Sequence, residues 1–129
     1  MGQQQLLLLA LGVIVVGIAV AIGITLFSES ASEKNREQLV SALTSLGAMA
    51  QEYYHTPTML GGGNKKYKKW KIPKFYEDFD AGKIKIKVDK KGKEVTITAI
   101  GKEKGWDNKN KVQLEAKVIP TNVNIKVLN

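Results

Sequence analysis

Residues 6–27 have the sequence LLLLALGVIVVGIAVAIGITLF, which contains no charged side chain and a single hydroxyl, that of Thr25. A helix of this length spans about 33 Å, close to the hydrocarbon thickness of a bilayer, about 30 Å. Its apolar side chains cover the whole circumference, which suits lipid or a tightly packed bundle better than one face of a soluble domain. The stretch therefore predicts a helix that crosses a membrane or lies in the core of an assembly.

A cleaved secretory signal is an alternative for this stretch. Such signals begin with basic residues, continue with about 7–15 apolar residues and end at a cleavage site of small residues. The run here is longer, and no Lys or Arg precedes it. Residues 28–31, Ser-Glu-Ser-Ala, have the composition of a cleavage region, so the alternative stays open.

Three glycines interrupt the run, at Gly12, Gly17 and Gly23. Each lowers helix propensity by about 1 kcal/mol relative to alanine. Small residues allow neighbouring helices to approach closely, although membrane helices also tolerate glycine without such a role. We expect the segment to pack against copies of itself. The candidate self-packing set consists of Gln5, Leu6, Leu7, Leu8, Leu9, Leu11, Gly12, Val13, Ile14, Val16, Gly17, Ile18, Val20, Ile22, Gly23, Ile24 and Phe27.

The rest of the chain carries all of the charge. The 129 residues include 20 basic and 12 acidic side chains, a net charge of +8, and none of these precedes Glu29. This length allows one domain with at most an appendage. Without cysteine there is no disulfide or thiolate metal site, and the single His55 excludes a multi-histidine metal cluster. We therefore expect neither an enzyme nor a bound cofactor.

The helical pattern continues beyond Phe27, because no proline or glycine separates the apolar run from the polar residues 28–38. Glu33 and Glu37 bracket Arg36 at helical spacing, which is typical of a solvated face. Apolar residues then recur every three or four positions along one face, at Leu39, Leu43, Leu46, Ala50 and Tyr53. The helix should end before Pro57, because a residue that precedes proline avoids helical geometry. One helix is thus expected over about residues 3–55.

The last third of the chain has the alternation of half-buried strands. Residues 83–88 are KIKIKV, and similar alternation follows over 95–99, 112–118 and 123–127, with a turn at Gly92. Four short strands predict an antiparallel meander with one apolar and one lysine-rich face. The apolar helix stripe should cover the apolar face. The expected helix–sheet contacts involve Leu39, Leu43, Leu46, Ala50, Tyr53, Ile84, Ile86, Val88, Val95, Ile97, Val112, Leu114, Val123 and Ile125.

The predicted fold class is α+β, a long N-terminal helix packed on a small four-stranded antiparallel sheet. Residues 1–28 form the apolar helix, which crosses a membrane or lies in the core of a bundle, and residues 29–56 form its amphipathic continuation. Residues 57–82 form a Gly/Lys-rich connecting loop, and residues 83–129 form the sheet domain.

The connecting loop contains a triglycine, residues 61–63, that we expect to act as a flexible hinge. Next comes a basic and aromatic run in which lysines could contact phosphates while aromatic rings stack on bases. That candidate polyanion-binding set is Lys65, Lys66, Tyr67, Lys68, Lys69 and Trp70. The preferred alternative is that Trp70, Ile72 and Phe75 attach the loop to the domain while the lysines stay in solvent. Nucleic acid is accordingly the less favoured partner.

The order of an uncharged N-terminal run, a helix that becomes amphipathic and a terminal antiparallel sheet resembles a type IV pilin-like subunit. The chain is also similar to bacterial pilin-like proteins that begin MGQQQLLL and have Tyr-Tyr, a triglycine and Trp-x-Ile-Pro at the positions of residues 53–54, 61–63 and 70–73. In pilins, a glutamate at the fifth mature position pairs with a neighbour's N-terminal amine. Here that position is Gln5, whose amide can accept a hydrogen bond but forms no ion pair.

The resemblance implies a monomer held in the inner membrane, assembly machinery of the pilus type, and a homopolymeric helical filament on the cell surface, of the kind that serves adhesion. In such a filament, the self-packing set from Gln5 to Phe27 would form the filament-core interface. The sequence departs from the pilin pattern in three respects: no basic leader is visible, so either it was removed or processing differs, and there is neither a helix proline nor a cysteine for a C-terminal disulfide loop. Two other functions fit the same pattern. One is a single-pass membrane-anchored protein whose basic domain binds anionic lipid, polysaccharide or nucleic acid, and the other is a pseudopilin-like minor component of a secretion system.

Overall fold

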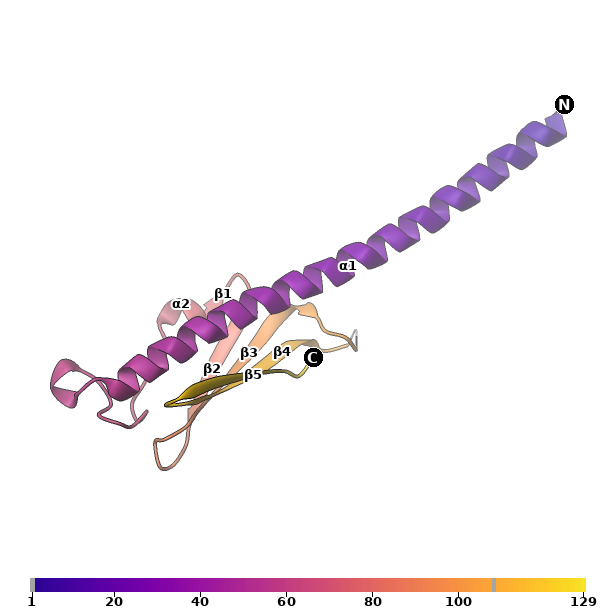
Figure 1. Ribbon diagram of the computed structural model, residues 1–129. Helices are drawn as coiled ribbons and strands as arrows, with labels where there is room; N and C mark the ends of the chain where they lie inside the picture. Colours follow the sequence, from indigo (N-terminus) through magenta and orange to yellow (C-terminus); the bar gives the residue numbers. More distant parts are fainter. Residues whose placement is uncertain (1, 108) are drawn as a thin grey trace. The chain divides into compact units, whose positions relative to one another are not determined.

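A computed structural model of the chain describes residues 2–107 and 109–129. Two compact units divide the chain, Met1–Ala31 and Ser32–Asn129, and the long helix α1 contributes to both. The elements along the chain are α1 (Gly2–His55), the 3₁₀ helix η1 (Thr58–Leu60), α2 (Lys74–Glu77), β1 (Asp78–Phe79), β2 (Gly82–Val88), β3 (Val95–Lys104), β4 (Lys111–Ile119) and β5 (Asn122–Val127) (Figure 1).

The long helix was predicted over about residues 3–55 and extends from Gly2 to His55 without a break. The seamless change from apolar to amphipathic sequence thus gives one 54-residue helix. Residues 2–30 are exposed over their whole length, whereas the stripe that begins at Leu39 is buried. One helix therefore contains two segments with different surroundings.

The sheet has five antiparallel strands in the order β1-β2-β3-β4-β5, one more than the four predicted. The additional strand, β1, has two residues, and Asp78 and Phe79 pair with Lys83 and Gly82 of β2. A strand of two residues is too short to show the alternation on which the sequence prediction relied. The remaining four strands lie where the alternating segments predicted them.

The register of these four strands places apolar side chains in rows across one face. One row contains Ile84, Ala99, Leu114 and Val127. The next row contains Ile86, Ile97, Ala116 and Ile125. The opposite face carries the intervening residues, such as Lys85, Thr98, Glu115 and Lys126. The sheet thus has one apolar and one lysine-rich face, as predicted.

The second half of α1 covers the apolar face (Figure 1). Leu39, Leu43 and Leu46 are fully buried against the sheet residues. At Gly47 an added Cβ would lie 2.9 Å from Cγ2 of Val123, so glycine allows the helix to approach β5 closely. The fold is therefore an α+β arrangement of a long helix on an antiparallel sheet.

The triglycine after α1 forms a tight cap rather than the flexible hinge that we expected. The backbone N–H of Gly63 donates to the carbonyl of Tyr53 at 2.8 Å, and that of Lys65 donates to the carbonyl of Tyr54 at 2.7 Å. A Cβ at Gly63 would lie 1.7 Å from the carbonyl oxygen of Lys66. The glycines are required because the chain folds back onto the helix end and satisfies its free carbonyl groups.

Candidate functional site: the exposed apolar segment and the surfaces of the folded unit

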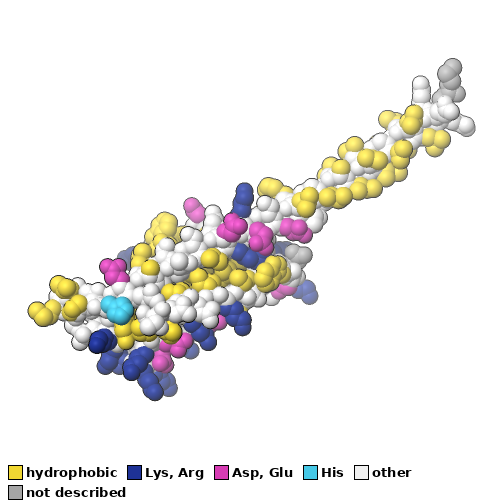
Figure 2. Space-filling view, viewed as in Figure 1, with side chains coloured by type: hydrophobic (Ala, Val, Ile, Leu, Met, Phe, Trp, Pro, Cys, Tyr) yellow, Lys and Arg dark blue, Asp and Glu magenta, His cyan; other side chains and the backbone are white. Residues whose placement is uncertain are grey.

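The most unusual surface of the molecule is the apolar first half of α1 (Figure 2). Its large hydrophobic side chains are between 54% exposed, at Ile22, and 77% exposed, at Phe27. Near the N-terminus α1 is long and apolar enough to cross a membrane, with an 18-residue window of mean hydropathy 3.0 that is not buried at all. At about 25 cal/mol per Å², so large an apolar surface would cost tens of kcal/mol in water. The segment therefore needs lipid or protein around it.

All residues of the predicted filament-core interface lie on this exposed segment, Gln5 to Phe27. An added Cβ at Gly12, Gly17 or Gly23 would have nothing within 4 Å. At about 100° per residue, Gly12 and Gly23 lie within about 20° of one another around the helix, and Gly17 lies about 140° away from Gly12. The segment thus presents small residues on two sides, which suits a helix with more than one close neighbour.

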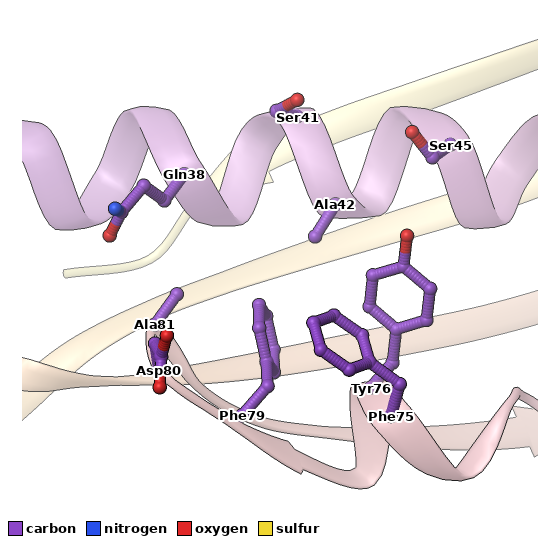
Figure 3. A pocket seen from close by; sticks show the side chains of 9 residues that line it. All are labelled: Gln38, Ser41, Ala42, Ser45, Phe75, Tyr76, Phe79, Asp80 and Ala81. Carbon is purple, nitrogen blue, oxygen red and sulfur yellow. The ribbon is translucent and has the colours of Figure 1, made fainter.

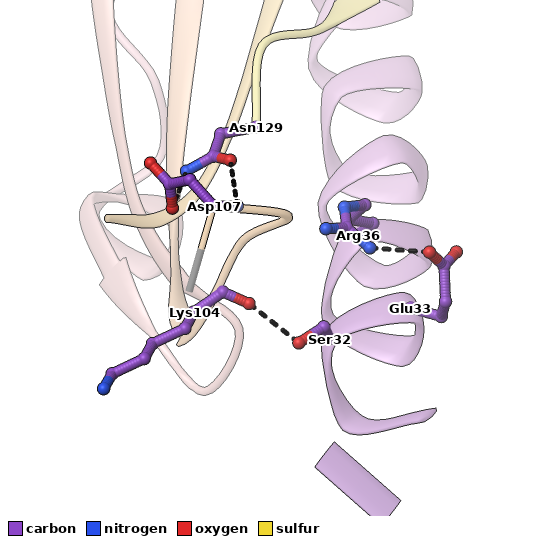
Figure 4. Close-up of polar contacts among 6 residues, drawn as sticks. All are labelled: Ser32, Glu33, Arg36, Lys104, Asp107 and Asn129. Carbon is purple, nitrogen blue, oxygen red and sulfur yellow. Dashed lines mark hydrogen bonds and ion pairs between the residues drawn. The ribbon is translucent and has the colours of Figure 1, made fainter. Parts of the chain in front are cut away.

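Within the folded unit, polar side chains attach the start of the buried half of α1 to the sheet. Asn35 is 5% exposed, and its Nδ2 donates to the carbonyl of Ala81 at 2.7 Å. Its Oδ1 accepts from the backbone N–H of Lys102 at 3.1 Å, where the β3–β4 register shifts. The Ser32 hydroxyl donates to the Lys104 carbonyl at 2.7 Å (Figure 4). This role of Asn35 was not predicted, although Asn35 lies four residues before Leu39 on the buried stripe.

Arg36 is buried, at 6% exposure, and does not lie on a solvated face as the sequence analysis expected. Its Nη1 donates to Glu33 Oε1 at 2.6 Å (Figure 4). Its Cζ lies 4.4 Å from the centroid of the Trp106 ring, a cation–π contact. Trp106 comes from the loop after β3 and covers the guanidinium, which spacing within the helix could not reveal.

A second polar cluster fastens the loop that contains Trp106. Asp107 Oδ1 accepts from the backbone N–H groups of Lys109 and Asn110, each at 3.0 Å, and from Nδ2 of Asn129 at 3.2 Å. These hydrogen bonds, above all the two from the backbone, lower the pKa of Asp107 to about 2. Asn129 thereby ties the loop to the segment after β5 (Figure 4).

In the candidate polyanion-binding set, the structure separates the aromatic rings from the lysines. Tyr67 is fully buried and Trp70 is 7% exposed, so neither ring is available to stack on a base. Burial, with a smaller contribution from Tyr54, raises the pKa of Tyr67 to about 12. Ile72 is also buried, whereas Phe75 is 69% exposed. Tyr67, Trp70 and Ile72 therefore attach the loop to the core, and the expected anchoring role of Phe75 is wrong.

The lysines of this set remain exposed, and the fold places further lysines beside them. The backbone N–H of Tyr67 donates to the carbonyl of Gly92 at 2.6 Å, and an added Cβ at Gly92 would lie 2.8 Å from Cγ of Lys68. The β2–β3 turn thus brings a second group of lysines to the first. Together they form a basic end of the folded unit, defined as Lys65, Lys66, Lys68, Lys69, Lys90, Lys91 and Lys93.

A groove of about 330 Å³ runs between α1 and the segment α2–β1 (Figure 3). Small and polar residues of α1 form one wall, and three aromatic rings form the other with centroids 5.3 to 5.7 Å apart. The lining residues are Gln38, Ser41, Ala42, Ser45, Phe75, Tyr76, Phe79, Asp80 and Ala81. This groove was not predicted from the sequence, because it depends on the short elements β1 and α2, which have no recognisable periodicity.

Comparisons of the chain with protein-family models, with curated proteins and with solved structures found no match. The geometry of the chain itself therefore carries the functional argument.

Proposed function

We propose that the chain is a structural subunit that polymerises through the apolar half of α1 into a helical, type IV pilus-like filament on the cell surface. One observation carries this proposal. Residues 2–28 are a fully exposed helix with no charged side chain, and the same helix continues without a break into a folded, charged unit. An anchor alone needs only apolar residues, whereas small residues on two sides of the helix favour close packing with several neighbours.

The proposed order of assembly follows from the two environments, lipid and a helix bundle, that can cover the apolar segment. Before assembly, the segment lies in the inner membrane, where lipid surrounds it. It leaves the lipid when neighbouring copies bury it in a shared bundle, with assembly machinery of the pilus type driving the transfer. Copies related by a screw axis make heterologous contacts and an open-ended fibre. The amides of Gln3, Gln4 and Gln5 then require hydrogen-bond partners in the bundle, since unpaired buried amides are costly.

Sheared surface material from cells that express the chain tests this proposal. Electron micrographs should show thin fibres composed of this chain. Leu11→Lys and Gly17→Lys should abolish them, because either change places a charge inside the bundle. Thr98→Lys, on the lysine-rich sheet face, is the matched control and should leave the fibres intact. A wild-type chain found only as detergent-soluble monomer would contradict the proposal.

The second candidate function is a membrane-anchored protein that binds an anionic polymer, and the basic end of the folded unit favours it. With the rings of Tyr67 and Trp70 buried, binding would rest on charge and show little sequence preference. Replacing Lys65, Lys66, Lys68 and Lys69 by Gln should make retention on immobilised duplex DNA or polyphosphate less dependent on salt. An unchanged salt dependence would dismiss this role.

A further inference from the structure

An apolar turn stands exposed just beyond the end of α1. Met59 is 97% exposed and Leu60 is 77% exposed. The turn is nevertheless fixed, because the backbone N–H of Leu60 donates to the carbonyl of Pro57 and that of Gly61 to the carbonyl of Thr58, both at 3.0 Å. A fixed turn that holds two apolar side chains in solvent is already ordered for binding, so little conformational entropy is lost on contact.

The groove beside α1 offers an apolar surface that the turn could contact. Phe75 is 69% exposed on its aromatic wall, and Ser41, Ala42 and Ser45 leave space on the helix wall (Figure 3). Its volume is about 330 Å³, whereas a cavity of about 150 Å³ accommodates a benzene ring. The groove is therefore large enough for two aliphatic side chains.

Lysines follow the turn in the sequence, and a carboxylate, that of Asp80, lines the groove. Residues 57–73, which contain the turn, include five lysines and no Asp or Glu. Of the acidic residues in the segment 74–80, Asp80 lines the groove. Asp78 pairs in register with Lys83 of β2, and Glu77 lines a separate pocket with Lys71 and Lys85. Opposite charges around matching apolar surfaces favour association and set its orientation.

We infer that the Met59–Leu60 turn of one copy inserts into the Phe75–Ser45 groove of the next copy. A contact within one chain is excluded, because ten helical residues separate Ser45 from His55, about 15 Å along α1. The contact is heterologous, so each copy offers one turn and one groove and the chain of contacts stays open. The inference rests on the proposed filament and gives it a second contact, between the folded units.

Cysteine cross-linking tests this contact in the full-length chain, which has no native cysteine. The double variant Met59→Cys/Ser45→Cys should yield a ladder of covalent multimers when sheared filaments are oxidised. A disulfide requires Cα atoms within about 7 Å, so the bond can form only between copies. The control, Met59→Cys/Thr44→Cys, replaces the exposed neighbour that does not line the groove and should cross-link several-fold less.

A charge reversal provides a second measurement on the same cross-linking pair. Lys66→Glu should lower the cross-linked fraction several-fold, and adding Asp80→Lys should restore it. Filaments that cross-link no better at Ser45 than at Thr44 would overturn this inference and leave the filament proposal standing. A wild-type chain that forms no assembly would overturn both.

Discussion

The two halves of α1 share one backbone and differ in what surrounds them. In the first half, residues 6–27, the large apolar side chains are all more than half exposed. In the second half, Leu39, Leu43, Leu46 and Ala50 have no exposed surface. The sheet of the same chain covers the second half, and nothing in the described residues covers the first. The sheet therefore covers only the second half of the helix, and the first half is an apolar surface long enough to cross a membrane.

A leucine-to-alanine substitution should show the largest difference in stability between the two halves of α1. Leu43→Ala removes a fully buried side chain and leaves a cavity, which should lower the free energy of unfolding of the folded unit by about 2–5 kcal/mol. Leu11→Ala alters an exposed side chain and should leave that unit unchanged. Thermal unfolding of the full-length chain in detergent, followed by near-ultraviolet circular dichroism of the buried aromatic residues, measures both.

The effect of Leu11→Ala shows whether the folded unit covers the first half of α1 in solution. Equal destabilisation by the two substitutions would mean that the first half is buried by the folded unit in solution. The expected result is instead a normal melting curve together with weaker assembly, because the proposed filament would bury Leu11 between copies.

Replacing a glycine by alanine should also have different effects in the folded unit and in the exposed half of α1. Gly63→Ala places a Cβ 1.7 Å from the Lys66 carbonyl oxygen, so the cap must distort, at a cost of about 1–3 kcal/mol. Gly17→Ala has no atom within 4 Å of its Cβ and should raise helix propensity by about 1 kcal/mol. The first should lower the melting temperature of the folded unit, and the second should leave it unchanged while it weakens assembly. An unchanged melting temperature in Gly63→Ala would mean that the triglycine is a flexible hinge, as predicted from the sequence, and not a tight cap.

Local periodicity was enough to predict much of the fold. The 3.6-residue stripe from Leu39 predicted the covered half of α1, and alternation predicted the four longer strands. Both signals arise because one face of each element is apolar. Features without such a period were missed: β1 has two residues, and the triglycine cap depends on carbonyl groups of residues 53–56 that only the folded chain brings near.

The candidate sites also differ in whether a local sequence signal or a contact between distant residues produces them. The exposed segment could be predicted because an uncharged run of this length is visible in the sequence itself. The burial of Tyr67 and the basic end could not, since both depend on a contact between the loop and Gly92, twenty-five residues away. Arg36 was misplaced for a similar reason, because Trp106 lies seventy residues further along the chain.

Substitutions of polar residues in the two halves of α1 should differ least in their effect on the stability of the folded unit. Asn35→Leu removes the donor to the Ala81 carbonyl and the acceptor for the Lys102 N–H. Ala81 is buried, so its carbonyl loses this bond away from solvent. The folded unit should lose about 1–3 kcal/mol of stability. Gln4→Leu, in the exposed half, should leave the melting temperature unchanged, as should the exposed neighbour control Lys34→Leu. Amide hydrogen exchange at Lys102 should rise in Asn35→Leu alone. An unchanged exchange rate at Lys102 would mean that Asn35 does not stabilise the irregular part of β3. The buried leucines of α1 would then be sufficient to attach the helix to the sheet.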